Sequence, residues 1–385
     1  MQKKIIALAI AGLASTAAFA QTNVTVYGVV DLGQAWVKSS GGSVVNSDQK
    51  TVGRLDNNSS YIGFKGTEDL GNGLKALFQL ETGYNSDNGG GWGGGRDTFV
   101  GLTGGFGTLV MGNLTHPLRA MGAKVEVLPG AAGFGTMASA TGTINHPALG
   151  EVKTGADDRA SNAIAYVSPN FSGLTATVAY VNGERRRSSD QNNPATVTDQ
   201  AENGKQYQAA LQYANGPLWV AGGYHKTIDL AASTVVGGAA LGGGVDARVW
   251  RLAATYDFPT NTKLTALYDN TRVDGPNSVP TADAKRSAWS VGVAQGFGAN
   301  TVGLEYGRRG QTNVNGNDPK DAAKIWTASY GYTLSKRTMV HARYSKLSNE
   351  RQGQAAFYNN PVNNNLSGSA GSDFTGYMVG LRHSF

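Results

Sequence analysis

Short segments in which apolar and polar residues alternate follow one another along most of the chain. The last segment shows the pattern well, because Tyr377, Val379 and Leu381 alternate with Gly380 and Arg382. A period of two is that of a β-strand whose two faces meet different surroundings. An unpaired apolar strand at a sheet edge invites aggregation, so a chain that ends on such a strand favours a sheet closed on itself.

The alternation predicts about sixteen strands, each of roughly the length that crosses a bilayer when tilted. We expect them at residues 24–37, 54–65, 73–84, 96–103, 106–112, 160–168, 172–181, 205–214, 217–227, 247–257, 262–271, 286–295, 300–309, 323–334, 337–346 and 373–385. An even number of strands fits a closed antiparallel barrel. The predicted fold class is therefore all-β, a transmembrane 16-stranded antiparallel β-barrel.

The predicted connections alternate between short and long. The long ones are residues 38–53, 85–95, 113–159, 182–204, 228–246, 272–285, 310–322 and 347–372, and those between them are tight turns. Outer-membrane barrels have this asymmetry, with short periplasmic turns and long extracellular loops. Both chain ends fall at the short-turn rim, which we therefore expect to face the periplasm.

Composition is compatible with such a barrel and excludes several other classes of protein. The mean hydropathy of −0.28 conceals two different faces, since only alternate residues of a membrane strand meet lipid. The formal net charge of +6 is mild for 385 residues, and nucleic-acid binding is not indicated. The chain has no cysteine, so neither disulfides nor thiolate metal sites are expected.

The N-terminus has the pattern of a secretory signal. Lys3 and Lys4 precede an apolar run, and Ala18-Phe19-Ala20 provides a small-x-small cleavage site. The run is too short for a confident membrane-spanning helix. We expect a signal peptide over residues 1–20 and the barrel over residues 21–385.

Residues 113–159 form the longest connection and the third long loop. It is rich in Gly, Ala and Thr, and its few charges include Arg119, Lys124 and Glu126. A 16-stranded barrel leaves a water-filled lumen, so a loop of small residues folded against the inner wall would set the width of the passage. The alternative is a flap outside the pore, because long loops are often plain surface structure.

Strand phase indicates which side chains enter the lumen. If Phe78 and Leu80 face lipid, then Lys75 and Glu81 face inward, together with Gln79. The same argument places Tyr61 and Lys65 inward, opposite Ile62 and Phe64. With Phe99 outward, Arg96 and Thr98 face inward, and with Ile164 and Tyr166 outward, Arg159 faces inward. The predicted pore-constriction residues are Arg96, Arg159, Tyr61, Lys75, Glu81, Arg119, Lys124 and Glu126.

Lys75, Arg96 and Arg159 predict a basic inner wall. Positive charge in a narrow passage favours anions, because a low-dielectric wall focuses the field. The alternative is that these side chains only pair with carboxylates such as Glu81, Glu126 or Asp157.

Neither catalysis nor metal binding is predicted. The mature chain's histidines are scattered, and none lies in a Gly-x-Ser-x-Gly or His-Glu-x-x-His setting; they are His116, His146, His225, His341 and His383. Asp157-Asp158 and residues 315–318 offer oxygen ligands for calcium, but such loops are usually solvated turns. We expect no enzyme activity, no cofactor and no metal.

Several segments, in their order and spacing, resemble the general-diffusion porins of the beta-proteobacterial outer membrane. They include Val24-Thr25-Val26-Tyr27-Gly28, Gly63-Phe64-Lys65-Gly66-Thr67-Glu68-Asp69-Leu70-Gly71-Asn72-Gly73, Asn162-Ala163-Ile164-Ala165-Tyr166 and the closing Val379-Gly380-Leu381-Arg382-His383-Ser384-Phe385. The resemblance implies a trimeric 16-stranded barrel of the Gram-negative outer membrane, in contact with membrane lipid and lipopolysaccharide. It also implies passive diffusion of small hydrophilic solutes and ions.

The family places arginines on the barrel wall opposite the third loop, and Arg96 and Arg159 stand at matching positions. Tyr61 stands where the family usually has an arginine, and Asn113 where many relatives carry a basic residue. The expected function is a general diffusion porin with a weak anion preference. Two alternatives are a porin selective for one small solute and a barrel acting mainly as a surface adhesin or receptor.

Overall fold

The computed structural model describes residues 23–44, 48–127, 135–137, 143–146, 150–183, 204–230, 235–236, 239–240, 245–275, 283–314, 316–357 and 370–385. The expected signal peptide, residues 1–20, lies outside the described residues. No helix in this part of the chain is long and apolar enough to span a bilayer.

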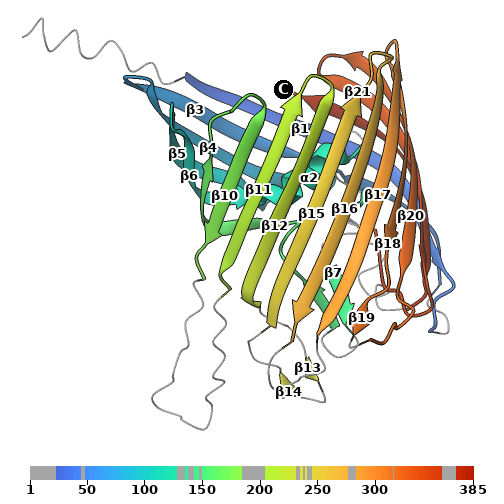
Figure 1. The fold of residues 1–385 in the computed structure, drawn as a ribbon. Coiled ribbons are helices and arrows are strands. Elements are labelled where there is room, and N and C mark those ends of the chain that lie inside the picture. The colour runs from blue at the N-terminus through green and yellow to red at the C-terminus, as the bar shows by residue number, and fades with distance from the viewer. Residues whose placement is uncertain are drawn as a thin grey trace, which may run out of the picture.

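Eighteen strand elements form one antiparallel sheet that closes into a barrel (Figure 1). They are β1 (Asn23–Ser40), β2 (Gln49–Asn57), β3 (Tyr61–Gly71), β4 (Leu74–Asn85), β5 (Gly90–Gly104), β6 (Gly107–Thr115), β9 (Arg159–Val167), β10 (Leu174–Val181), β11 (Gln206–Asn215), β12 (Leu218–Leu230), β15 (Val245–Asp257), β16 (Thr262–Asp274), β17 (Ala284–Phe297), β18 (Asn300–Arg309), β19 (Asn313–Val314), β20 (Ala323–Ser335), β21 (Thr338–Asn349) and β22 (Asp373–Ser384). β2 continues β3 along β1, and β19 continues β18 along β17. The eighteen elements therefore make sixteen strands, and the predicted fold class is confirmed.

The first and last strands close the sheet. β1 pairs with β22 from Val29↔Ser384 to Ser40↔Asp373. Beyond this ladder, Gly28 and Phe385 exchange two main-chain hydrogen bonds of 3.2 and 3.1 Å. The apolar strand that ends the chain thus has a partner on both edges, as its sequence predicts.

Buried polar contacts reinforce this closure on the inner side of β1. The carboxylate of Asp31, fully buried, accepts hydrogen bonds from His341 Nε2 at 2.9 Å and from Asn58 Nδ2 at 3.1 Å. It also forms an ion pair with Arg382 at 3.1 Å. The Asp31 side chain therefore links β1 to β21, to β22 and to the segment that connects β2 with β3.

Exposure alternates along the strands and identifies the two faces of the wall. On β15, Trp250 and Leu252 are 60 and 62% exposed, whereas Val249 and Arg251 are completely buried. The exposed apolar face is the one that meets lipid, so the buried face, which carries the polar side chains, points inward.

Tight turns join the strands at one rim. At Asn72-Gly73 both residues have positive φ, 51° and 77°, as a type I′ hairpin turn requires. At the other rim the connections are longer, with one exception. β5 begins at Gly90 rather than near residue 96, so only residues 86–89 remain of the predicted long loop 85–95.

The predicted phase of residues 96–103 is wrong. Val100 is 55% exposed and pairs with Phe78, whereas Phe99 packs with Val110 against the inner cluster. The reason is a β-bulge. Gly95 pairs with Thr82 and Thr98 pairs with Leu80, so three residue steps on β5 lie opposite two residue steps on β4. Residues 96 and 99 would face opposite sides of a regular strand. Because of the bulge, Arg96 and Phe99 both face inward.

The third long connection contains a helix that was not predicted, α2 (Pro117–Val125), and a short hairpin, β7 (Thr143–His146) with β8 (Gly150–Lys153). Pro117 starts the helix, where a missing N–H costs nothing. Leu118, Met121 and Val125 form its buried stripe. They pack with Ala221, Ala253, Leu267 and Val249 of the inner wall, and Figure 1 shows α2 behind β12 and β15.

Candidate pore constriction

Glu81 is the centre of a polar cluster on the inner wall of β1, β3, β4 and β5. Tyr27 Oη donates to Glu81 Oε2 at 3.1 Å, and Arg96 Nε forms an ion pair with Glu81 Oε1. The Arg96 guanidinium lies 4.2 Å from the centre of the Tyr61 ring, and Lys65 Nζ lies 4.9 Å from that of Tyr27. Both contacts have cation–π geometry. We call these five residues the Glu81 cluster.

Strand register and one glycine bring the Glu81 cluster together. Tyr27, Gly63 and Glu81 are cross-strand partners on β1, β3 and β4. A Cβ atom at Gly63 would lie 2.5 Å from the Tyr27 ring. The glycine therefore lets the tyrosine lie across β3 and reach the carboxylate.

A second cluster lies beside the first and centres on Asp97. Its carboxylate accepts hydrogen bonds from the main-chain N and Oγ1 of Thr115, at 2.5 and 2.8 Å. Arg159 Nε forms an ion pair with Asp97 Oδ2 at 3.2 Å. Since Arg96 and Asp97 are adjacent in the bulge, the two clusters are continuous along the wall.

The third loop brings a further arginine to this region. Arg119 on α2 donates to the main-chain carbonyl of Asp157, and its charge interacts with that of Arg159. Arg96 also interacts electrostatically with Arg159. Three guanidinium groups from β5, β9 and α2 are thus gathered near Glu81 and Asp97.

Arg251 of β15 holds the loop against the opposite wall. Its completely buried side chain donates to Leu118 O at 2.7 Å and to Asp157 Oδ2 at 2.9 Å, and forms an ion pair with Asp269 of β16. Its register partner across the sheet is Asp269. The approach of the helix also needs Gly223, because a Cβ atom there would lie 2.7 Å from a methyl group of Leu118.

Two histidines dock the returning segment 154–157. His116 Nδ1 donates to Gly155 O at 2.6 Å, and His225 Nε2 contacts Thr154 O at 2.9 Å, with the two rings 5.3 Å apart. Burial lowers the pKa of His116 to about 4, against a weaker opposite effect of its hydrogen bond to Gly155. His116 is therefore neutral at neutral pH, and these contacts assign it a structural role.

Farther along, carboxylates of the wall and of the loop hold the loop backbone. Val127 N donates to Glu305 Oε1 of β18 at 3.1 Å, and Met137 N donates to Glu126 Oε1 at 2.8 Å. Thr327 Oγ1 of β20 donates to Gly135 O at 2.7 Å. The described parts of the loop therefore follow the inner wall from β12 as far as β20.

The structure brings together some of the predicted constriction residues and separates others. Tyr61, Glu81, Arg96, Arg159 and Arg119 lie in or beside the two clusters. Glu126, just after α2, lies beside Glu305 of β18. Lys124 is exposed, with its carbonyl accepting a hydrogen bond from Lys263 Nζ at 3.0 Å.

Lys75 lies apart from these residues. It is the register partner of Asp69 and Thr103 near the short-turn rim. Six positions separate it from Glu81 along β4, which corresponds to about 20 Å. Lys75 therefore lies too far along the wall to act together with Arg96 and Arg159 as one group.

Sequence reasoning missed Asp97, Arg251 and a set of nearly buried inner-wall arginines. The latter are Arg286, Arg309 and Arg343. A signal existed for Arg251, because it alternates with the apolar Trp250 and Leu252 and therefore points inward. The bulge that brings Asp97 into the site has no comparable signal in the residues.

Comparisons with known proteins agree with this geometry. The family model described as Gram-negative porin matches residues 7–352. The chain belongs to the Gram-negative porin family. The outer membrane porin protein 32 of Delftia acidovorans is 31% identical to this porin over the full length of both chains. The porin is thus a passive channel of the outer membrane and not an enzyme.

Solved structures show the same barrel. An anion-selective porin from Comamonas acidovorans is 27% identical, with a TM-score of 0.70 over 95% of this chain and all of that one. OmpT of Vibrio cholerae, in its trimer form, shares the fold at 14% identity, with a TM-score of 0.64 over 94 and 99% of the two chains. Among the residues that the structure describes, no three acidic or histidine side chains gather as a metal site would require.

Replacing Arg251 by methionine should release the third loop. Asp157 and Asp269 would lose their shared cation inside a buried site, a change that typically costs about 3–5 kcal/mol. We expect a lower thermal unfolding temperature in detergent and noisier single-channel currents. Arg248→Met is the matched control, because Arg248 lies on the outward face of the same strand and pairs with Asp274. Equal effects of the two substitutions would contradict the assigned role of Arg251.

Proposed function

We propose that the third loop and the two polar clusters form the eyelet of this diffusion channel, and that the eyelet weakly favours anions. The observation that carries the proposal is that Arg96 and Arg119 both interact electrostatically with Arg159, beside the ion pairs that Glu81 and Asp97 form. Small hydrophilic solutes and ions would pass between this wall and the loop.

The charge balance supports a weak preference rather than a strong one. Glu81 neutralises much of Arg96, and Asp97 neutralises much of Arg159, whereas Lys65, beside Tyr27, has no carboxylate partner among the described residues and adds positive charge to the cluster. In a narrow passage with low-dielectric walls, even a small excess raises the local concentration of anions. The relative from Comamonas acidovorans, described as anion-selective, makes the same preference plausible in this chain.

The tyrosine at position 61 has a definite place in this proposal. Its ring lies against the Arg96 guanidinium, where the family usually has another arginine. We propose that Tyr61 orients Arg96 across the passage, so that the Arg96 guanidinium partly compensates for the arginine that is missing at position 61.

Loss of the two wall arginines should reduce the anion preference. We expect Arg96→Ala/Arg159→Ala to lower the chloride-to-potassium permeability ratio by roughly twofold or more, because both charges lie in the focused field. The measurement is the reversal potential across a planar bilayer under a potassium chloride gradient.

Lys75→Ala provides the control, since it removes a cation near the short-turn rim. Charges beyond about 8 Å are largely screened at physiological ionic strength, so its effect should be much smaller. An unchanged ratio in the double variant would disprove the proposed role of the arginines. A cation preference in the unmodified porin would move the controlling charge to Glu81 and Asp97.

We also propose that three copies assemble through the outward face of β3–β6. This face exposes apolar side chains, and the residues are Phe64, Leu80, Val100, Leu102 and Met111. Shape and apolar packing rather than the hydrophobic effect would drive association there, because lipid competes equally well.

A charge placed on that face should dissociate the trimer. Leu80→Arg is expected to convert the trimer to monomers in mild detergent, as measured by analytical ultracentrifugation. Leu252→Arg puts the same charge on the outward face of β15, where Leu252 is 62% exposed, and should leave the assembly intact. If both variants remain trimeric, the proposed interface is wrong.

The expected leader peptide completes the proposal for the outer-membrane location. Cleavage after Ala20 would make Gln21 the first residue of the mature porin. The intact mass of protein purified from outer membranes should therefore correspond to residues 21–385. A mass that includes residues 1–20 would overturn this assignment.

A further inference from the structure

Aromatic rings form a tier on the outward face of β12–β21. Its members are Tyr224, Trp250, Trp289, Tyr306, Trp326 and Tyr344. Ring centres lie 4.4 Å apart for Tyr224 and Trp250, and 4.4 Å apart for Tyr306 and Trp326. Such rings mark the depth at which a membrane protein meets the lipid headgroups.

Cations follow on the same face, nearer the long-loop rim. We call them the outer cation row, and they are Lys226, Arg248, Arg272, Lys285, Arg308, Lys324 and Lys346. Most are cross-strand neighbours, with Lys226 opposite Arg248, Arg272 opposite both Arg248 and Lys285, and Arg308 opposite Lys324. The row therefore lies at headgroup depth, just beyond the aromatic tier.

The two halves of the row differ in their partners. On β12–β16, Lys226 pairs with Asp246, and Arg248 and Arg272 both pair with Asp274. On β18–β21, Arg308, Lys324 and Lys346 are exposed and form no salt bridge with any residue that the structure describes. Three neighbouring cations thus have no carboxylate partner within the described part of the chain.

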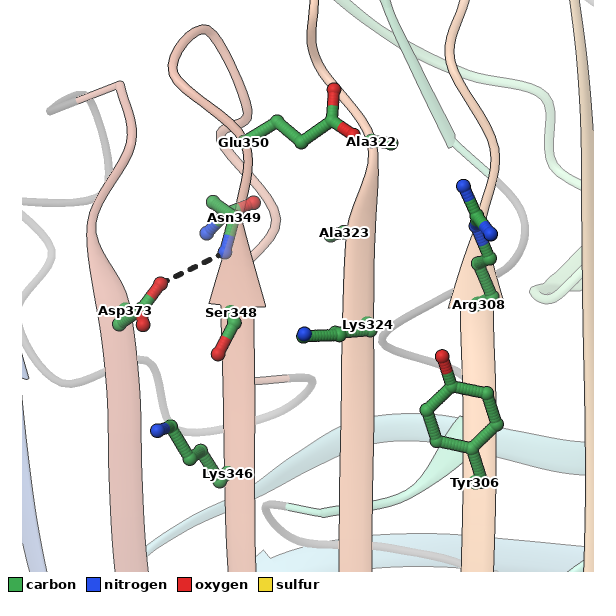
Figure 2. A pocket seen from close by; sticks show the side chains of 10 residues that line it. All are labelled: Tyr306, Arg308, Ala322, Ala323, Lys324, Lys346, Ser348, Asn349, Glu350 and Asp373. Carbon is green, nitrogen blue, oxygen red and sulfur yellow. Dashed lines mark hydrogen bonds between the residues drawn. The ribbon is translucent and has the colours of Figure 1, made fainter.

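These three cations line a pocket of about 540 Å³ (Figure 2). Its two carboxylates already have hydrogen-bond donors. Glu350 Oε2 accepts from Gln311 Nε2 at 2.9 Å, and Asp373 Oδ1 accepts from the main-chain N of Asn349 at 3.0 Å. Tyr306 and Ser348 add hydroxyl groups to the lining.

We propose that this pocket binds a phosphate group of lipopolysaccharide. Arginine and lysine are the side chains best suited to phosphate, and hydroxyl groups can complete its hydrogen bonding. The site opens on the lipid side of the wall and not into the lumen, which favours a membrane lipid over a soluble anion. Long loops are extracellular in such barrels, so the row lies in the outer leaflet, where lipopolysaccharide resides.

The test uses the folded porin in detergent with EDTA, so that no divalent cation can bridge two anionic groups. Binding of fluorescent diphosphorylated lipid A is followed by polarisation, and dephosphorylated lipid A, phosphatidylglycerol and inorganic phosphate serve as competitors. The variant is Arg308→Gln/Lys324→Gln/Lys346→Gln. Since a basic side chain near an anionic surface contributes about 1 kcal/mol, its loss of affinity should be roughly tenfold or more.

The matched control is Lys75→Gln/Lys336→Gln/Arg337→Gln, which removes three cations near the short-turn rim. We expect it to bind like the unmodified porin, and Lys324→Arg to retain binding. Only diphosphorylated lipid A should compete well.

Affinity of the triple variant within twofold of the unmodified porin would overturn the proposal, as would equal competition by inorganic phosphate or loss of all binding in EDTA. The proposal rests on the outer-membrane location and not on the eyelet. Unchanged single-channel conductance of the triple variant shows that it is folded, so failure here and failure of the proposed ion preference are separate outcomes.

Discussion

The buried guanidinium of Arg251 is the contact on which the position of the third loop depends. It joins two strands of the wall, through Asp269, to both ends of the third loop, through Leu118 and Asp157. A completely buried cation is costly unless its hydrogen-bond donors are satisfied, and here the carboxylates and the carbonyl provide the acceptors. This requirement fixes where the loop lies, because Arg251 is left with unmet donors if the loop moves away.

The two walls of the lumen consequently have different tasks. The wall of β12–β20 is covered by the loop, and its glycines and buried polar groups serve to dock it. The wall of β1–β9 carries the ion pairs of Glu81 with Arg96 and of Asp97 with Arg159, which solutes would meet. Arg96 and Arg159 lie on this wall beside Glu81 and Asp97, whereas Arg251 on the other wall serves attachment of the loop.

Most of the barrel could be predicted from sequence, and much of the site could not. Alternation and turn residues are local signals, so all sixteen strands and their closure through β22 follow from the residues. The bulge at Arg96 and Asp97 and the helix α2 depend on contacts with distant parts of the chain. For that reason the phase of Phe99 was wrong, Asp97 and Arg251 were missed, and Lys75 was grouped with residues far from it along the strand.

The docking of the third loop also has a consequence for the order of assembly. The wall residues that hold helix α2 and the described segments after it, from Gly223 and Arg251 to Glu305 and Thr327, come later in the chain than the loop itself. The loop thus has no surface to rest on until strands β12–β20 are in place, and contacts so far apart in sequence form slowly. Docking of the loop is therefore a late event in biogenesis, and under the proposed role of the loop a barrel arrested before β20 would have a wider passage than the finished channel.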